Sequence, residues 1–228
     1  MNWIADNIGL ILELALAHLW QSAIPIVLGF FLSLPLGWIA WRYRLVRGPV
    51  VVVTGLLYTI PSLALLILLP ALIGISTRDP ANLIIGLTIY AIAILVRAVA
   101  DGLDSVDPAI RQSATAVGYG GFRRFWTVDF PLAAPVILAG LRVTAVSTIS
   151  LATVGILVGV ENLGYLFTNG LQRRIIAEVF AGVIAVVVIA LMIDLLLLLA
   201  GRALMPWTRA IKTPSADRRP ARIVRVAA

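Results

Sequence analysis

The sequence has no cysteine, a single histidine and few charged residues. Without cysteine, a disulfide framework and a thiol nucleophile are both excluded. The lone His18 stands two residues before Trp20, and this setting favours an amphipathic anchor at a membrane interface over a ligand or a catalyst. Only 13% of the 228 residues are charged, against roughly a quarter in a soluble domain. With 61% hydrophobic residues and a mean hydropathy of +1.03, the composition predicts an integral membrane protein.

Long apolar runs predict an all-α membrane protein with about five transmembrane helices. About 20 helical residues cross a bilayer core. The expected spans are Ser22 to Trp41, Val50 to Ile75, Asn82 to beyond Val96, Pro135 to Val158 and Ile175 to Ala200. We assign residues 20–200 to one membrane domain, residues 1–19 to an N-terminal interfacial helix and residues 201–228 to a basic tail. The chain starts without a basic region, which does not fit a cleavable signal peptide.

Two of these spans contain residues that could line a path for a polar solute. Pro61 interrupts the second span and frees a backbone carbonyl, which protein or water must satisfy; the alternative is a packing kink. In the fourth span, small and weakly polar residues from Gly140 to Gly159 share one helical face, which equally suits close helix packing. The residues assigned to the path are Tyr58, Pro61, Ser62, Thr144, Ser147 and Thr148.

The longest polar interruption between the spans runs from Asp107 to Pro131. Asp107 can cap the N-terminus of a short helix, Pro108 suits its first position, and Gly118 can close its C-terminus. A second segment, Phe122 to Phe130, mixes aromatic and charged residues. We therefore predict a helix-turn-helix over 107–131 that serves as a docking surface for another protein.

Three aspartates precede this stretch, and they do not predict a metal site. Asp101, Asp104 and Asp107 recur at every third position, but no His or Cys lies near them. We interpret them as a solvated face with local salt bridges, with Asp107 also acting as a cap.

The distribution of Lys and Arg predicts how the spans are oriented. Five spans place the two ends of the chain on opposite sides of the membrane. With the C-terminus inside, fourteen of the 18 Lys and Arg residues lie inside, three lie outside, and Arg142 lies within a span. Because inner loops are enriched in Lys and Arg, we expect the N-terminus outside and the C-terminus inside.

The Asp107 to Pro131 stretch resembles the cytoplasmic coupling loop of ABC-importer permeases. That loop reads Glu-Ala-Ala, three residues, Gly, nine residues, Ile-x-Leu-Pro. Here the same spacing reads Gln112-Ser113-Ala114, Gly118 and Val128-Asp129-Phe130-Pro131. Gln112 and Ser113 replace the leading Glu and the first Ala. The resemblance implies that an ATPase subunit is contacted by Gln112, Ser113, Ala114, Gly118, Phe122 and Pro131.

Four shorter segments resemble the osmoprotectant branch of these permeases. They are His18-Leu19, Pro35-Leu36-Gly37, Thr59-Ile-Pro-Ser-Leu-Ala-Leu-Leu66 and Asn162-Leu163-Gly164. That branch imports quaternary ammonium compounds such as glycine betaine, carnitine or choline, and sometimes proline. It often has a pair of small residues where this chain has Glu161-Asn162. A permease of the same fold for methionine or another amino acid, or a passive channel or anchor subunit, is the alternative.

The resemblance also implies the partners and the location of the chain. It implies a type I ABC importer permease in the bacterial inner membrane, surrounded by lipid, with no nucleic acid bound. A second permease, identical or paralogous, would complete the pore, and a binding protein outside the membrane would deliver solute. The chain has no G-x-x-x-x-G-K-[ST] phosphate loop. ATP and Mg therefore belong to two partner ATPase subunits, and no enzyme activity, catalytic residue or cofactor is expected here.

Overall fold

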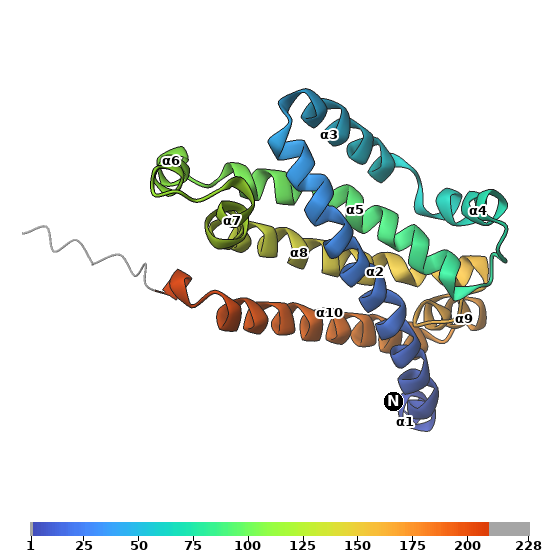
Figure 1. Ribbon diagram of the computed structural model, residues 1–228. Coiled ribbons are helices and arrows are strands. Elements are labelled where there is room, and N and C mark those ends of the chain that lie inside the picture. Colours follow the sequence, from blue (N-terminus) through green and yellow to red (C-terminus); the bar gives the residue numbers. More distant parts are fainter. Residues whose placement is uncertain (1, 210–228) are drawn as a thin grey trace, which may run out of the picture.

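The computed structural model describes residues 2–209, and this part of the chain is a bundle of helices (Figure 1). Four helical segments within it are long and apolar enough to cross a membrane. They are α2 (Ile8–Arg42), α5 (Pro80–Asp104), the run Gly121–Val158 and α10 (Ile176–Leu204). A bent pair of helices between α2 and α5 supplies a fifth span if the pair is counted as one. The predicted all-α membrane fold is confirmed.

The N-terminal helix predicted over residues 1–19 has the wrong boundary. A short helix, α1 (Asn2–Asp6), is followed by one continuous helix from Ile8 to Arg42. No glycine or proline lies around residue 19 to break it, and Ile11 and Leu14 pack in one buried cluster with residues of α10. The first half of α2 is therefore held by tertiary packing rather than standing apart from the span.

The second predicted span, Val50 to Ile75, is two helices. Helices α3 (Arg44–Thr59) and α4 (Ser62–Ile73) meet at an angle of 103°. Ile60 precedes a proline, and a proline disfavours helical geometry in the residue before it; Ile60 accordingly has φ −64° and ψ 127°. Pro61 breaks the helix here instead of kinking it.

Helix α5 is the centre of the bundle. Its Leu95, Val96 and Ala100 are fully buried. Small residues on its neighbours let the backbones approach closely: a Cβ on Gly29 of α2 would overlap Ala91, and a Cβ on Gly140 would overlap Ala98. The middle of α5 is thereby packed closely against α2 and α8 (Phe130–Ala152).

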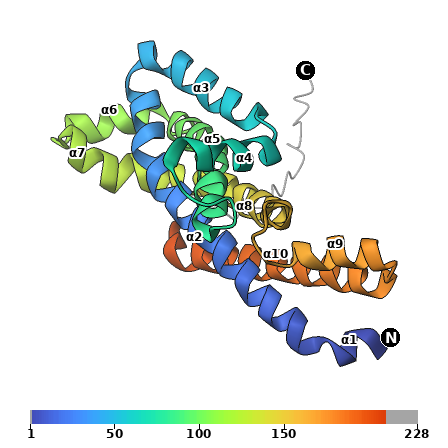
Figure 2. The same cartoon turned by 90° about the vertical axis from the view of Figure 1, so that its right-hand side faces the viewer.

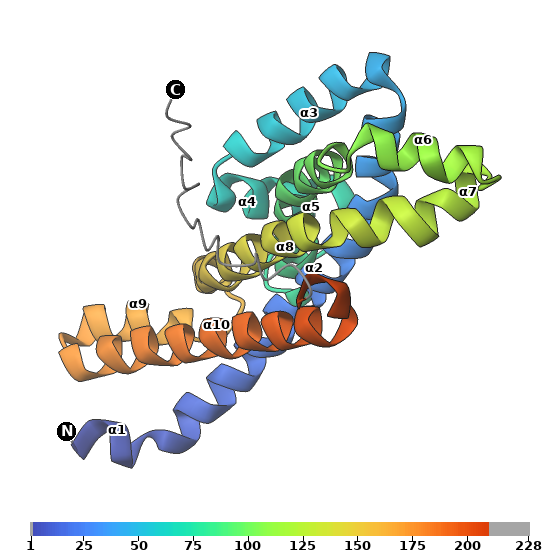
Figure 3. The same cartoon turned by 90° about the vertical axis from the view of Figure 1, so that its left-hand side faces the viewer.

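After α5 the chain forms a helical hairpin that projects from the bundle (Figures 2 and 3). Helix α6 (Pro108–Ala116) leads out, and α7 (Gly121–Arg124) leads back through a π-helical turn, η1 (Phe125–Asp129), into α8 (Phe130–Ala152). We call residues 107–130 the α6–α7 hairpin. The predicted helix-turn-helix is confirmed, with its second arm continuous with the following span.

The last two α-helices, α9 (Gly164–Arg173) and α10, form the side of the bundle opposite α3 (Figures 1 and 3). α8 tightens into a 3₁₀ segment, η2 (Thr153–Val158), and α9 then packs beside α10, which is followed by a 3₁₀ turn, η3 (Pro206–Arg209). α10 extends past the expected end at Ala200. Most of the predicted basic tail, residues 210–228, lies outside the described residues.

The basic segments gather at one end of the bundle, on the left in Figure 1. The α2–α3 corner, the α6–α7 hairpin and the C-terminal end of α10 all lie there, while α4, α9 and the N-terminus lie at the other. We call these the basic end and the α9 end. The grouping is the one that the Lys and Arg count requires.

Candidate coupling and transport site

Helix α6 has the two caps that its sequence predicts. Oδ1 of Asp107 accepts a hydrogen bond of 2.8 Å from the backbone N–H of Ala109. At the other end, the N–H of Tyr119 bonds to the carbonyl of Ala114 at 3.1 Å, the longer of the two bonds of a Schellman motif. Gly118 has φ +94°, a left-handed conformation that glycine adopts at little cost.

The residues expected to contact an ATPase are largely uncovered in this chain. Phe122 is 81% exposed, and a Cβ at Gly118 would meet no atom within 4 Å. Gln112 and Ser113 are exposed, while Ala114 and Pro131 are half-buried. The structure thus places these residues on or beside the hairpin.

A buried carboxylate, which the sequence analysis did not single out, anchors the hairpin. Asp129 is 1% exposed and accepts hydrogen bonds from Nε of Arg111 at 3.1 Å and from Nε of Arg124 at 3.2 Å. A buried charge needs such partners. The 18-residue separation of Arg111 and Asp129 has no local pattern to reveal it, so only the hairpin geometry identifies the pair.

Arg111 also ties the hairpin to two long helices. Its guanidinium lies 4.8 Å from the ring centroid of Trp41, at the end of α2, which is cation–π geometry. It also donates to the carbonyl of Leu103, near the end of α5. One side chain on α6 therefore contacts α2, α5 and η1 together.

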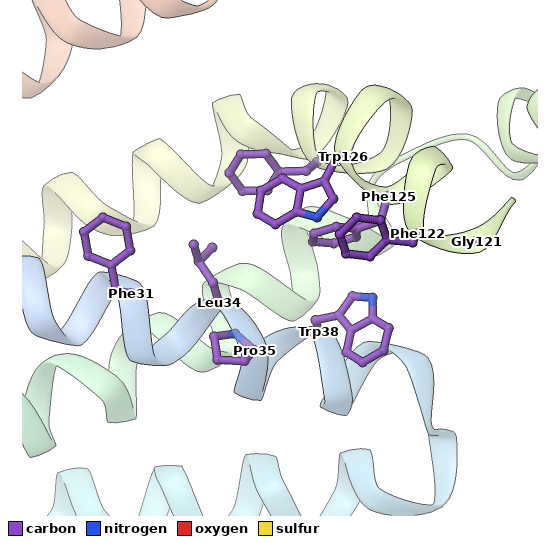
Figure 4. A pocket seen from close by; sticks show the side chains of 9 residues that line it. Phe31, Leu34, Pro35, Trp38, Gly121, Phe122, Phe125 and Trp126 are labelled. Atoms are coloured by element: carbon purple, nitrogen blue, oxygen red, sulfur yellow. The ribbon is translucent and has the colours of Figure 1, made fainter. Parts of the chain in front are cut away.

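An aromatic groove of 620 Å³ opens between α2 and the second arm of the hairpin (Figure 4). Trp38 of α2 and Phe125 of η1 face each other edge to face, with centroids 6.3 Å apart. The groove is lined by Phe31, Leu34, Pro35, Trp38, Gly121, Phe122, Phe125, Trp126 and Phe130.

Three of the predicted path residues lie at the break between α3 and α4. Tyr58 is exposed, and its ring meets that of Tyr90 edge to face at 6.1 Å. Pro61 is exposed and Ser62 is half-buried. The hydroxyl of Tyr90 donates to the carbonyl of Ile60 at 2.5 Å. A protein group thus satisfies a carbonyl beside the break, as the bilayer requires.

The other three predicted path residues lie on α8 and are more deeply placed. Thr144 and Thr148 are 0% and 1% exposed, and Ser147 is half-buried. The hydroxyl of Thr144 donates to the carbonyl of Gly140, which packs against α5. This favours helix packing for the two threonines. Among the described side chains, no hydrogen bond or ring contact joins the α8 group to the residues at the α3–α4 break.

Comparison with known proteins places this geometry in a family. Residues 21–210 match the family described as the binding-protein-dependent transport system inner membrane component. The chain belongs to that family. It is an integral permease subunit of the inner membrane, and the match includes both the spans and the α6–α7 hairpin.

Individual relatives cover nearly the whole permease. It is 30% identical to the osmoprotectant import permease protein OsmW of Salmonella typhimurium, over 86% of this chain and 93% of the relative. It is 31% identical to the glycine betaine/carnitine/choline transport system permease protein OpuCD of Bacillus subtilis, over 90% and 89%. An inward-facing structure of the MetNI methionine ABC transporter has a TM-score of 0.72 at 19% identity, over 89% of this chain and 97% of that one. The last similarity shows the fold alone, and it is the type I importer fold that the sequence predicts.

At the α9 end of this permease, a buried polar cluster joins two of the segments that resemble the osmoprotectant branch. His18 is fully buried, with Nε2 3.0 Å from the carbonyl of Ile149. That carbonyl is available as an acceptor because the N–H of Thr153, at the start of the 3₁₀ segment η2, bonds to the carbonyls of Ser150 and Leu151 instead. The interpretation of His18 as an interfacial anchor is therefore wrong: it binds α2 to the end of α8.

Asn162 completes this cluster. Its amide donates to Oε1 of Gln21 at 3.0 Å and to the carbonyl of Ala152 at 2.8 Å, and its carbonyl oxygen accepts from the N–H of Gly164. A Cβ on Gly164 would overlap the carbonyl oxygen of Thr153. The Asn162-Leu163-Gly164 segment thus fixes the turn from η2 into α9 against α2.

Two charged features have simple structural roles. Arg142 and Asp194 form a two-bond ion pair between α8 and α10, with both bonds at 2.7 Å. Arg47 pairs with Asp104 and, at 3.4 Å, with Asp101. The predicted local salt bridges of the aspartates are confirmed. Within residues 2–209, no group of three His, Asp or Glu side chains could hold a metal ion.

Proposed function

We propose that this chain is a translocation subunit of an ATP-driven importer of quaternary ammonium osmoprotectants, such as glycine betaine, choline or carnitine, or of proline. The observation that carries the proposal is the similarity to osmoprotectant permeases over nearly the full length of the chain. The exposed α6–α7 hairpin supports the ATP-driven part, because it offers a projecting surface to an ATPase subunit.

Coupling in this proposal is mechanical. An ATPase subunit binds the hairpin through Phe122, Gly118 and the residues around Gln112, and its closure moves α6. Arg111 and Asp129 pass that movement to α2, α5 and α8, because their contacts join these helices to the hairpin. The spans then alternate between outward-open and inward-open states.

The complete importer requires partners that this chain does not supply. We assign ATP and Mg to two ATPase subunits at the basic end, which lies in the cytoplasm, and a solute-binding protein to the α9 end, which lies outside. A second permease, identical or paralogous, completes the pore. The apolar span of α10 supports this arrangement, since only 6% of its most apolar stretch is fully buried within the chain, and its exposed side is available to lipid or to that partner.

The solute path is assigned to the α3–α4 break. Tyr58 presents an exposed aromatic ring beside Pro61 and Ser62, with the buried Tyr90 ring packed edge to face against it, and aromatic faces attract quaternary ammonium cations. Ser147 contributes from α8. In the present conformation Thr144 and Thr148 act in packing, so a direct role in the path requires a movement of α8 against α5.

Methionine or another amino acid is a weaker candidate for the solute. Solved permeases of amino-acid importers share the fold at 14% to 19% identity, whereas osmoprotectant permeases are 30% to 31% identical to this chain. A passive channel or anchor subunit would have no use for an exposed hairpin with the coupling-loop spacing.

Uptake assays test the solute assignment. The gene for this chain is deleted in a host without redundant transporters, and the deletion strain is complemented with the wild-type gene. We expect the deletion to lower osmotically stimulated uptake of labelled glycine betaine, choline, carnitine or proline, and complementation to restore it. Methionine uptake serves as the control. Unchanged uptake of all four compounds, with loss of methionine uptake, would transfer the assignment to an amino acid.

A further inference from the structure

Five arginines surround a second pocket at the basic end. The pocket has a volume of 490 Å³ and lies where the end of α2 and the start of α3 face the hairpin. It is lined by Trp41, Arg42, Arg44, Arg47, Asp104, Arg111 and Arg124. Two of the arginines also bind Asp129, so part of this charge is compensated from within the chain.

Arg42 and Arg44 supply positive charge that no described acidic group neutralises. Arg47 pairs with Asp104 and Asp101, and Arg111 and Arg124 share Asp129. Arg42 has only a cation–π contact, 5.8 Å from the ring centroid of Tyr43, and Arg44 forms no ion pair with any residue from 2 to 209. Both side chains are exposed. The pocket therefore has a net positive charge and two free guanidinium groups for an anion.

The aromatic groove of Figure 4 adjoins this pocket along the same helix. Trp38 lines the groove and Trp41 lines the pocket, one helical turn further toward the basic end. On the hairpin side, Phe125 lines the groove and the adjacent Arg124 lines the pocket. At 1.5 Å per residue, the groove extends about 10 Å along α2 from Phe31 to Trp38, and Arg42 follows about 6 Å beyond.

We propose that the two cavities form one binding site for an anionic phospholipid. The phosphate binds Arg42 and Arg44, and one acyl chain occupies the groove beside Phe31. The order of the parts matches a lipid in a leaflet, with apolar surface first, then a tryptophan belt, then arginines at the surface. The adjoining apolar groove favours a lipid over a soluble phosphate ester, because only a lipid would fill the groove and the pocket together.

Native mass spectrometry of the full chain in detergent tests this proposal. The protein is titrated with phosphatidylglycerol or phosphatidylcholine of matched acyl chains. The test variant is Arg42→Gln/Arg44→Gln, and the control is Arg173→Gln/Arg174→Gln, an equal change of charge on exposed residues at the α9 end. At about 1 kcal/mol per basic residue, we expect phosphatidylglycerol affinity to fall on the order of tenfold to thirtyfold in the test variant and to hold in the control.

Two further arms distinguish the lipid from other occupants. Phe31→Ala, a change at the end of the groove far from the hairpin, should weaken phosphatidylglycerol binding without touching the arginines. Glycerol 3-phosphate should not displace the lipid at comparable concentration. Equal binding of the two lipids, equal affinity in the test variant and the control, or displacement by glycerol 3-phosphate would overturn the proposal. So would unchanged lipid binding with lost ATPase recruitment in Arg42→Gln/Arg44→Gln, which would assign the arginines to a protein contact.

Discussion

Gly118 and Gly164 are both required at their positions, but for different physical reasons. Gly118 needs its positive φ to end α6, and a short capped helix in the sequence is enough to predict this. Gly164 has no unusual φ in the structure. It is required because the carbonyl of Thr153 approaches its Cα, and this contact depends on how η2 folds back onto α9. No local pattern predicts such an approach.

At the residue scale, Gly164→Ala should destabilise the permease by about 1 to 3 kcal/mol, because the added methyl group overlaps backbone that cannot rotate away. The melting temperature of the purified protein in detergent and the amount recovered in the membrane fraction measure this. Gly9→Ala is the control, since a Cβ there meets nothing within 4 Å. Equal melting temperatures for the two variants would contradict the close approach.

Among the elements, the α6–α7 hairpin was the most predictable and the α3–α4 pair the least. The hairpin is set by local caps at Asp107 and Gly118, which sequence shows directly. For α3 and α4, one apolar run continues across the Pro61 break. Hydropathy cannot distinguish a kinked span from a bend of 103°, because both bury the same residues in an apolar environment. The sequence does not reveal the packing role of His18 for a different reason: its partner, the carbonyl of Ile149, lies 131 residues away.

Asp129→Asn tests how the hairpin is held. Removing the buried charge leaves Arg111 and Arg124 without their counter-ion, a loss that typically costs about 3 kcal/mol or more in a buried pair. The arginines are partly exposed, with side chains 16% and 24% accessible, so we expect a smaller effect, near 1 to 2 kcal/mol. Hydrogen exchange of amides 111–124 should become faster, and ATPase stimulation should fall.

The matched control for this change is Asp101→Asn. Asp101 forms ion pairs at the same end, but its side chain is 52% exposed, and pairs of this kind contribute about 0 to 1 kcal/mol. If both variants exchange at the same rate, Asp129 is not the residue that fixes the hairpin.

At the scale of the whole molecule, the arrangement of the helices agrees with the count of basic residues. The α2–α3 corner, the hairpin and the end of α10 share one end in Figure 1. Arg47 binds Asp101 and Asp104 across this end, and α10 reaches Phe130 there. The sequence could predict this grouping because it depends on the number of crossings and not on packing details.

The orientation itself can be measured with single cysteines, because the chain has none of its own. Both Ser105 and Ser76 are exposed, at the basic end and in the α4–α5 turn. In intact cells, Ser76→Cys should react with an impermeant thiol reagent, and Ser105→Cys should react only after the cells are opened. Labelling of Ser105→Cys from outside would reverse the topology and remove the hairpin from the side where ATP is found.

The central claim is that the α6–α7 hairpin transmits ATPase movement to the spans. Phe122→Ala removes an aromatic ring that is 81% exposed and that meets the ring of Trp126 edge to face at 6.4 Å. Loss of an interface anchor often costs more than about 1 kcal/mol. Gly118→Asp adds a charge at the same surface and about 1 to 2 kcal/mol of backbone strain. Leu171→Ala, at a residue 76% exposed at the α9 end, is the control.

The measurement is ATPase activity and solute transport by the importer reconstituted with its ATPase, second permease and binding protein. Both hairpin variants should insert into the membrane and pair normally, yet recruit little ATPase and give little stimulated hydrolysis or transport. Leu171→Ala should retain normal ATPase recruitment, stimulated ATP hydrolysis and solute transport. Normal ATPase recruitment with full transport in Gly118→Asp and Phe122→Ala would show that the hairpin is a connector between α5 and α8 and not the coupling element.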